Sequence, residues 1–447
     1  MNNYKLKMKN NLINILLTIL ILLLSGKVEA QSIDSLVNEA VANNPQLKSL
    51  QYRIDASKYR SESINNLPPP NLSVEFSQVP INEYDVFNQS ISNNLALSQM
   101  FPLGGKLSAM AEVENKNTLV EGNSFEVYKI NLTAQVKMSY YTLWLIDRKI
   151  EIQKKNILLL IDFEKVIEVL FYTNRISQAD VLTVQSEIAS NETQLLITEK
   201  QREAAIYKLN KLLGRDLNSK DVYAITEFEA DSLELSQSQL EEILTDSNPS
   251  LSRMSNMIEM NRAMITANNK ELIPDLMVQG MLMRMPRGMI LTSQSDLTIL
   301  DPNTEVMYSL MFSINLPFAP WSIGKIKYKE EELAAGINSI EQGKYDMQRE
   351  MTAQLKEALV KYNTAKELTE LYDKKVIPLY TNSAESQTAA YQNGKTSITT
   401  VIDSYRMLLM QRMNYLMSKA DVQMSLAEVE MMVGVNLNNF ISLKGNE

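Results

Sequence analysis

A long internal repeat constrains the fold of this chain more than any other feature of its sequence. Residues 43–72 and 247–276 share one pattern, and matching positions continue towards the C-terminus. Because a repeat of this length is one structural unit written twice, we expect a fold built from two similar halves. The matched positions are Asn44-Pro45 with Asn248-Pro249, Pro70-Asn71-Leu72 with Pro274-Asp275-Leu276, 171–182 with 391–402, and Gly214 with Gly434.

The repeat predicts how the chain is divided. A first repeat over 31–214 would contain a helix, two strands and a long helical hairpin, and a second over 241–434 would contain the same elements. Residues 215–240 would connect them, and 435–447 would form a C-terminal tail.

The first 30 residues have the order of a secretory signal peptide. Three lysines precede an apolar run over 12–24, and Val28-Glu29-Ala30 precedes Gln31, which predicts cleavage after Ala30. The alternative is an uncleaved membrane anchor, but the run of about 13 residues is shorter than the ~20 that a spanning helix needs. We therefore expect the mature chain to leave the cytoplasm.

Composition argues against several classes of protein. The chain has no cysteine and no histidine, which excludes disulfides and thiolate sites and removes the commonest metal ligand and general base. Its net charge of −9 disfavours binding to nucleic acid, whose phosphates need a cationic surface. We expect no enzymatic activity, no cofactor and no nucleic-acid partner.

Most of the chain is predicted to be helical, since it contains only 13 glycines and 13 prolines. Apolar residues recur at helical spacing along 106–173 and again along 325–393. A short turn follows each segment, and a returning helix then runs to Gly214 or Gly434. Each repeat should therefore contain an antiparallel helical hairpin.

Each long helix is preceded by segments that alternate with period two. The alternation is regular at 72–77 and 307–316 and weaker at 91–101 and 276–285, which predicts two strands in each repeat. Strands of about 9–11 residues with one apolar face are typical of membrane barrels, although a soluble antiparallel sheet has the same alternation. Because four strands cannot close a wide barrel, a membrane barrel would need several chains.

Over 31–447 the chain resembles the TolC-type outer-membrane efflux factors. The resemblance is carried by the doubled asparagine–proline pattern, by Pro102-Leu-Gly-Gly-Lys106 at the start of a long helix, and by the two hairpin tips. The tip patterns are Ser177-x-x-Asp180-Val-Leu182 and Tyr391-x-x-Gly394-x-x-Ser397. In composition alone, the methionine-rich second half is similar to the copper and silver efflux branch of the family.

The resemblance implies an α+β membrane protein. Three chains would each give four strands to an outer-membrane β-barrel, continued by a long periplasmic α-helical barrel with 215–240 in an equatorial region. The trimer would passively conduct substrates expelled by an inner-membrane pump of the resistance-nodulation-division type through a periplasmic adaptor. A type I protein secretion channel and a secreted coiled-coil scaffold remain alternatives, whereas a periplasmic enzyme would need a site that we do not find.

The resemblance also implies a gate at the hairpin tips. The family narrows its periplasmic entrance with acidic rings, and its pattern places Asp403 at one gate carboxylate, with Thr400 in place of the other. In the first repeat, Asp180 lies at the position that matches Thr400. Capping of the helix that follows Ser177 is an alternative role for Asp180.

Adaptor contact in the family is made tip to tip, although turn chemistry alone would explain the same residue types. Pro378 falls inside the second long helix, where proline removes a hydrogen bond and kinks the backbone, and we hypothesise that this kink lets the second hairpin swing. The implied contact residues are Thr173, Asn174, Arg175, Ser177, Asn393, Gly394, Lys395 and Ser397.

Methionine is abundant, with 25 residues that lie mostly in the second half. Thioethers are soft ligands that suit Cu(I) or Ag(I), and strand methionines should face the lumen if the opposite, apolar face meets lipid. We assign no metal site, but Met281, Met283, Met307 and Met311 are candidate soft-metal contacts. Packing between helices is the stronger explanation for the methionines within 254–264 and 407–417.

Overall fold

The structure is a computed structural model that describes residues 32–82, 84–219, 228, 233, 235–286, 290–293, 296–299 and 304–437, with only the backbone of 290–293 and 296–299. The predicted signal peptide, most of the 215–240 connection and most of the 435–447 tail lie outside the described residues.

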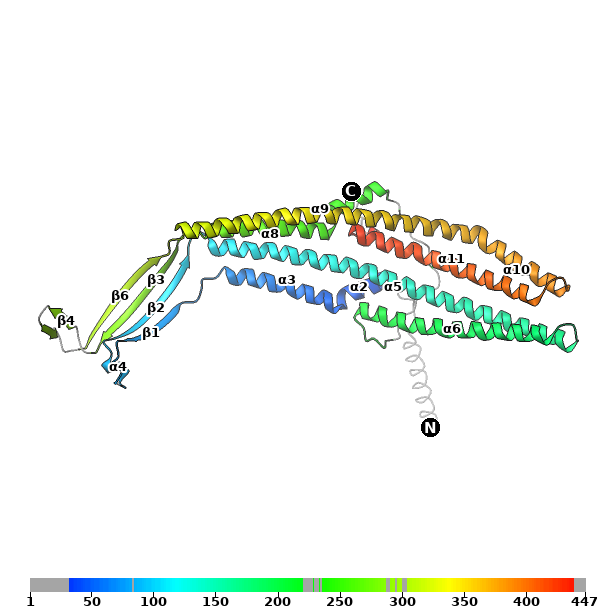
Figure 1. The fold of residues 1–447 in the computed structure, drawn as a ribbon, viewed down its shortest axis with the longest axis horizontal. Helices are drawn as coiled ribbons and strands as arrows, with labels where there is room; N and C mark the ends of the chain where they lie inside the picture. The colour runs from blue at the N-terminus through cyan, green and yellow to red at the C-terminus, as the bar shows by residue number, and fades with distance from the viewer. Residues whose placement is uncertain are drawn as a thin grey trace, which may run out of the picture. The chain divides into compact units, whose positions relative to one another are not determined.

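Helices make up most of the described chain (Figure 1). None of them, among the residues described, combines the length and the apolar composition needed to cross a bilayer. The helices are α2 (Ile33–Asn43), α3 (Pro45–Ile64), α4 (Val86–Gln89), α5 (Lys106–Tyr172), α6 (Gln178–Leu213), α7 (Gln237–Ser247), α8 (Pro249–Lys270), α9 (Pro320–Leu371), the π-helix η1 (Tyr372–Val376), α10 (Ile377–Gln392) and α11 (Ile398–Val433).

The strands form two separate sheets. The larger sheet has the order β1-β2-β3-β6, and all its neighbours are antiparallel. The smaller sheet pairs β4 with β5. The strands are β1 (Asn71–Ser77), β2 (Ser92–Pro102), β3 (Asp275–Met285), β4 (Ile290–Ser293), β5 (Asp296–Ile299) and β6 (Glu305–Ile314).

The repeated asparagine–proline motif starts a helix in both places. The Asn44 side-chain oxygen accepts hydrogen bonds from the backbone N–H groups of Gln46 and Leu47, at 3.0 and 3.3 Å. The Asn248 oxygen accepts one from Ser250 at 2.8 Å. An asparagine cap followed by proline at the first helical position is a strong helix start, because proline has no N–H to leave unsatisfied.

The two predicted repeats contain corresponding elements in the same order. In the first, α3 is followed by β1, β2, α5 and α6; in the second, α8 is followed by β3, β6, the α9 to α10 segment and α11. Their equivalence in three dimensions stays a prediction.

The chain packs as two compact units, each described by itself below. The strand unit comprises Lys48–Val127 and Thr245–Met351. The tip unit comprises the described residues within 1–47, 128–244 and 352–447.

The larger sheet, in the strand unit, has two chemically different faces. Residues that pair directly across antiparallel strands share a face, so the register sorts the side chains. One face, which we call the apolar sheet face, carries mostly aliphatic and aromatic residues, with Asn93, Gln99 and Arg284 as its polar members. Many of its apolar side chains are exposed in the single chain: Leu310 and Phe312 are each 67% exposed. Its aliphatic and aromatic members are Leu72, Val74, Phe76, Leu95, Leu97, Phe101, Leu276, Val278, Leu282, Val306, Tyr308, Leu310, Phe312 and Ile314.

A tight junction joins the start of α5 to the region of β3. Gly104 has a φ of +68°, and a Cβ atom there would lie 2.2 Å from Ile273 Cδ1, so only glycine fits. The buried Lys106 ammonium lies 2.8 Å from an Asp275 oxygen and 3.5 Å from a Glu271 oxygen. These ion pairs compensate for the burial of the lysine charge and fix the helix start.

The core of the tip unit lies along its helices. Helices α5 and α6 form one antiparallel hairpin, and α10 and α11 form the other (Figure 1). The largest buried side chains of α5 are Tyr140 and Trp144; Tyr140 packs with Leu36 of α2 and Leu209 of α6. Arg215 also binds Glu39 through two guanidinium nitrogens, at 2.5 and 2.6 Å, which ties the end of the first hairpin to α2.

Most predicted elements appear within one or two residues of their expected bounds, but three features differ. Helix α9 begins at Pro320 rather than near residue 325, because proline is tolerated in the first turn of a helix. The predicted second long helix is interrupted by η1. The short elements α4, β4 and β5 were not predicted.

Candidate functional site

The two hairpin tips have the same backbone geometry. Asn174 and Gly394 have left-handed φ values of 52° and 66°, and each turn is closed by the same two hydrogen bonds. All eight predicted adaptor-contact residues lie in these turns and are exposed. The closing bonds run from Asn174 N to Phe171 O at 2.9 Å, from Arg175 N to Leu170 O at 2.9 Å, from Gly394 N to Tyr391 O at 2.8 Å, and from Lys395 N to Ala390 O at 2.9 Å.

Asp180 forms a capping box with Ser177. The Ser177 hydroxyl oxygen accepts a hydrogen bond from the Asp180 N–H at 3.3 Å, and the Asp180 carboxylate accepts one from the Ser177 N–H at 3.0 Å. Thr400 cannot supply a carboxylate, and its hydroxyl instead lies 3.0 Å from that of Ser397. The geometry therefore gives Asp180 the capping role that was its alternative, while a role in the pore stays a prediction.

The predicted gate residue Asp403 belongs to a charged cluster between the two hairpins. Arg406 donates one hydrogen bond to Asp403 and a second to Glu187 of α6, each at 2.7 Å. The hydrogen bond with Glu187 is the main cause that raises the pKa of Arg406. We call Glu187, Asp403 and Arg406 the hairpin bridge, since Arg406 links α11 to α6 through it.

Apolar side chains from both hairpins pack together behind the tips. Ile167 and Val184 of the first hairpin form one buried cluster with Ile398 and Ile402 of the second. Tyr391 packs at its edge, and burial, followed by the charge of Asp180, raises the pKa of its phenol. The hairpin bridge thus adds a directed polar contact to hairpins that already share an apolar core.

Pro378 lies directly after the π-helical turn η1, near the start of α10. Proline cannot donate the backbone hydrogen bond that a continuous helix requires there, and a single π turn is a common way to absorb the mismatch. The structure therefore has a π turn directly before Pro378, whereas a kink at Pro378 and swinging of the hairpin stay predictions.

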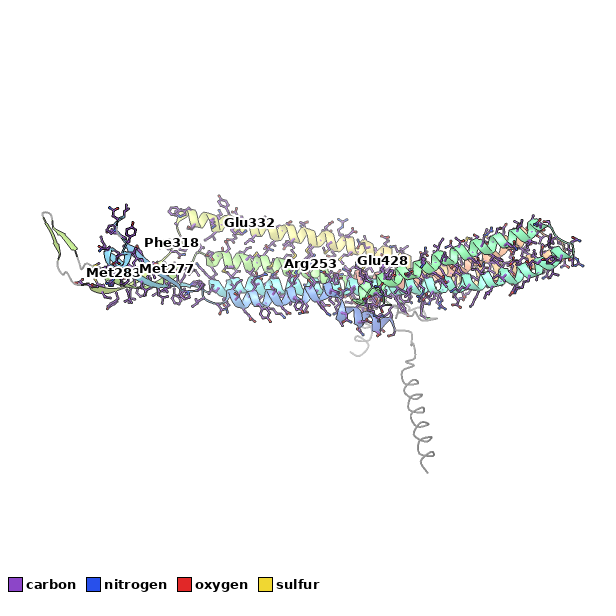
Figure 2. The ribbon with its side chains drawn as sticks, turned by 90° about the horizontal axis from the view of Figure 1, so that it is seen from below. Arg253, Met277, Met283, Phe318, Glu332 and Glu428 are labelled. Atoms are coloured by element: carbon purple, nitrogen blue, oxygen red, sulfur yellow. The ribbon has the colours of Figure 1, made fainter. Side chains whose placement is uncertain are left out.

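The face of the larger sheet opposite the apolar one carries methionine and small polar residues. Figure 2 labels Met277 and Met283, both on β3. The register puts them on one face with Met281 of β3 and with Met307 and Met311 of β6. The prediction that these methionines lie opposite Leu276, Val278, Leu310 and Phe312 is thus confirmed.

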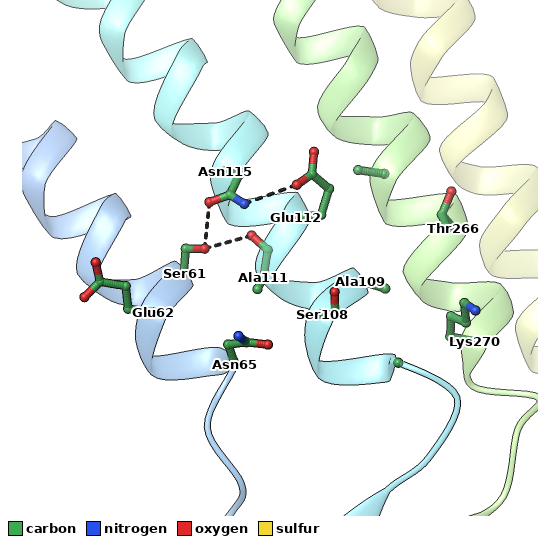
Figure 3. Close-up of a pocket in the computed structure, with 12 residues that line it drawn as sticks. Ser61, Glu62, Asn65, Ser108, Ala109, Ala111, Glu112, Asn115, Thr266 and Lys270 are labelled. Carbon is green, nitrogen blue, oxygen red and sulfur yellow. Dashed lines mark hydrogen bonds between the residues drawn. The ribbon is translucent and has the colours of Figure 1, made fainter.

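A polar groove runs between α3, α5 and α8 in the strand unit (Figure 3). Its volume is about 580 Å³, and Ser61 anchors one wall by donating to Ala111 O at 3.0 Å and to Asn115 Oδ1 at 2.7 Å. Glu62, Glu112 and Lys270 add two negative charges and one positive charge to its lining. The groove lacks a nucleophile paired with a base and gives no catalytic arrangement.

Within the described part of the chain, no cluster of three or more carboxylate, histidine or cysteine side chains could hold a metal ion. A hard-cation site of carboxylates is therefore not among the features of the described residues.

Comparison with known proteins gives a result only at the level of structure. No family model matches the chain. No curated protein matches it in sequence. Solved structures, in contrast, match over most of their length.

Three of these structures are outer-membrane or transmembrane channels. The channel OprN aligns with a TM-score of 0.69 at 15% identity, covering 90% of both chains. CusC aligns with 0.71 at 17% identity, covering 91% of this chain and 93% of its own. The Campylobacter jejuni outer-membrane channel CmeC aligns with 0.72 at 13% identity, covering 93% of this chain and 89% of its own.

The chain has the TolC-like outer-membrane efflux channel fold. The sequence-based resemblance is therefore confirmed at the level of fold. The high helix content and the four-stranded sheet of this efflux-channel fold were expected from the sequence. Trimer formation and barrel closure stay predictions.

Sequence reasoning on the efflux-channel fold missed two polar sites. Arg406 and Glu187 were not predicted, although a basic residue three positions after Asp403 is a visible helix-pairing signal. The sequence indicated Lys106 only as part of a helix start, and its burial beside Asp275 had no local signal. Both sites join segments that lie far apart in the sequence.

Proposed function

We propose that this chain is the outer-membrane exit duct of a tripartite efflux system. Three chains would each contribute β1, β2, β3 and β6 to one closed barrel in the outer membrane, and their helices would continue it as a tunnel in the periplasm. The duct would be passive and need no cofactor, while an inner-membrane pump supplies the energy. The similarity in fold to outer-membrane channels over about nine-tenths of the chain supports this proposal.

One observation carries the proposal: the apolar sheet face is exposed in the single chain. Tyr308 is 80% exposed and Leu310 67%, on a strand of 10 residues. A continuous apolar surface of this kind needs a covering phase, and strands of about 9–11 residues match the thickness of a bilayer. Lipid is the covering phase that the strand length favours, which leaves the methionine face toward the barrel lumen.

The tips would be the meeting point with the periplasmic adaptor. Their exposed residues, from Thr173 to Ser177 and from Asn393 to Ser397, form two matched turns that a repeating adaptor ring could bind in the same way. Asp403 would face the tunnel as a gate carboxylate, and its side chain is 54% exposed beside Arg406. A pump of the resistance-nodulation-division type is the expected third component.

A matched pair of substitutions tests the orientation of the sheet. Leu310→Arg puts a charge on the apolar face, and Ser309→Arg puts the same charge on the opposite face one residue away. An arginine facing lipid near the bilayer centre costs roughly 2–4 kcal/mol, whereas one in a lumen is hydrated. We expect Leu310→Arg to lower the amount of heat-modifiable trimer in outer-membrane fractions, and Ser309→Arg to leave it near the parent level.

Equal losses in both variants, or recovery of the parent as a soluble monomer, would refute the proposal and favour the secreted scaffold. Single-channel recordings of the purified trimer in planar bilayers provide the functional measurement. Cross-linking from Lys395 in cells, followed by identification of the captured adaptor, would separate an efflux system from type I protein secretion.

A further inference from the structure

Seven methionines on the described strands of the larger sheet form two groups, one of four and one of three. All lie on the face opposite the apolar one, which we call the thioether face. The first group is Met281, Met283, Met285 and Met307; the second is Met100, Met277 and Met311.

The first group is held together by register. Met283 of β3 pairs directly with Met307 of β6, and Met281 lies diagonally beside Met307 on the same face. Directly paired residues have Cβ atoms about 4.5–5.5 Å apart, and diagonal neighbours are about 7–8 Å apart. Methionine side chains are long and flexible enough for three sulfur atoms at these spacings to reach one ion.

The second group repeats the arrangement further along the sheet. Met100 of β2 pairs directly with Met277 of β3, and Met311 of β6 is a diagonal neighbour of Met277. Met281 and Met311 are also diagonal neighbours, so the two groups adjoin. From position 277 to 283 the strand rises roughly 20 Å at about 3.3 Å per residue, so the groups form a track rather than a point.

Packing does not explain where these methionines occur. The apolar sheet face uses leucine, valine, isoleucine, phenylalanine and tyrosine, and contains no methionine among the described strand residues. On the thioether face almost every apolar residue is methionine. The only other apolar residues there, among the described strands, are Ala96 and Pro102. Met100, Met277 and Met311 are 43, 38 and 46% exposed, so they are not filling a core.

The surroundings of the track are suited to a cation. No lysine or arginine lies on the thioether face of the described strands, whereas Glu75 and Glu305 do. Asn94 pairs directly with Met283 and is only 9% exposed, and its side-chain oxygen has no hydrogen-bond partner. A buried oxygen acceptor without a partner is costly unless a ligand satisfies it, and this one lies beside the first group.

We infer that the thioether face binds soft monovalent cations, Cu(I) or Ag(I), along its track of methionines. Neutral thioethers prefer soft metals and offer little to Na⁺, K⁺ or Mg²⁺. Two adjoining groups of the same donors let an ion pass from one group to the next without a change of charge. This inference rests on the proposed function only in assigning the thioether face to the lumen.

Silver binding by the purified full-length protein tests the inference. Ag(I) is added as nitrate in chloride-free buffer, and bound silver is measured by calorimetry and by metal analysis after gel filtration. We expect the parent to bind at least one Ag(I) per chain and the triple variant Met281→Leu, Met283→Leu, Met307→Leu to bind at least tenfold more weakly. The matched control replaces Met254, Met257 and Met260 of α8 by leucine and should keep the parent affinity.

Three results would overturn the inference: no silver bound by the parent, unchanged affinity in the strand variant, or an equal loss in the α8 control. If the triple variant does not fold, the single variants Met283→Leu and Met307→Leu provide the same comparison, and each should weaken binding. Conductance in silver-free buffer is measured in parallel. Absence of conductance in the parent would refute the exit duct, whereas silver binding tests the track alone.

Discussion

The hairpin bridge allows a sharp prediction, because its two hydrogen bonds have different mechanical consequences. The bond from Arg406 to Asp403 spans three residues of one helix, so it cannot hold two hairpins together. The bond from Arg406 to Glu187 joins α11 to α6 across 219 residues of sequence. Glu187→Gln should therefore loosen the contact between the hairpins, whereas Asp403→Asn should not.

The strength of the ion pair between Arg406 and Glu187 follows from how exposed the two side chains are. The Glu187 side chain is 15% exposed, but that of Arg406 is 58% exposed, so solvent screens the pair. Exposed ion pairs contribute about 0.2–1 kcal/mol, and the well-aligned bond of 2.7 Å places this one near the upper end. About 1 kcal/mol corresponds to a roughly fivefold change in the balance between joined and separated hairpins in each chain.

The assay is single-channel recording in planar bilayers, which measures the open probability of the channel. Glu187→Gln should raise it about fivefold or more, and Arg406→Gln should do the same. The double variant should be no more open than either single variant, since both remove one interaction. Asp403→Asn should leave the open probability unchanged while weakening block by multivalent cations.

The reasoning would be refuted if Glu187→Gln had the same open probability as the parent, or if Asp403→Asn raised the open probability as much as Glu187→Gln does. An Asp403→Asn protein with unchanged cation block would remove Asp403 from the gate.

Three further predictions concern local structure. Gly104→Ala should destabilise the protein more than Gly105→Ala in chemical denaturation, since both residues have positive φ but only Gly104 would bring a Cβ within 2.2 Å of Ile273; equal effects would contradict the close-approach argument. Asn44→Ala should lower the free energy of unfolding by about 1 kcal/mol from the lost cap and by more in total, because Asn44 also donates to Leu212 O at 3.1 Å; urea melts that show no destabilisation would contradict this. Pro378→Ala should reduce export while leaving trimer yield unchanged if the irregular turn at η1 acts as a hinge; intact export and adaptor dependence would leave the turn a structural role only.

Local patterns determined the elements of this protein closely. The helix expected over 106–173 is observed as Lys106–Tyr172, and the strand expected over 91–101 as Ser92–Pro102. Both periodicities arise from backbone geometry within a few residues, so they can be read without knowledge of distant segments. The exceptions follow the same reasoning: proline at the start of α9 shifted a boundary, and η1 depends on how the backbone relaxes before Pro378.

For the methionines of the sheet, the sequence predicted the face on which they lie but not their neighbours. Alternation within β3 and β6 was enough to predict that methionine and the aliphatic residues would lie on opposite faces. Alternation could not predict which methionines would be neighbours, because register depends on pairing between strands. The direct pairs Met283 with Met307 and Met100 with Met277 appear only in the sheet.

The sequence by itself thus determined the order of elements, the helical hairpins and the two faces of the sheet, because these follow from residue spacing along one segment. The tertiary structure decided that Arg406 meets Glu187, that Lys106 is buried beside Asp275, and that the strand methionines lie next to one another in two groups. Each of these contacts joins segments distant in the chain, and its energy depends on burial and alignment that exist only after the segments have packed.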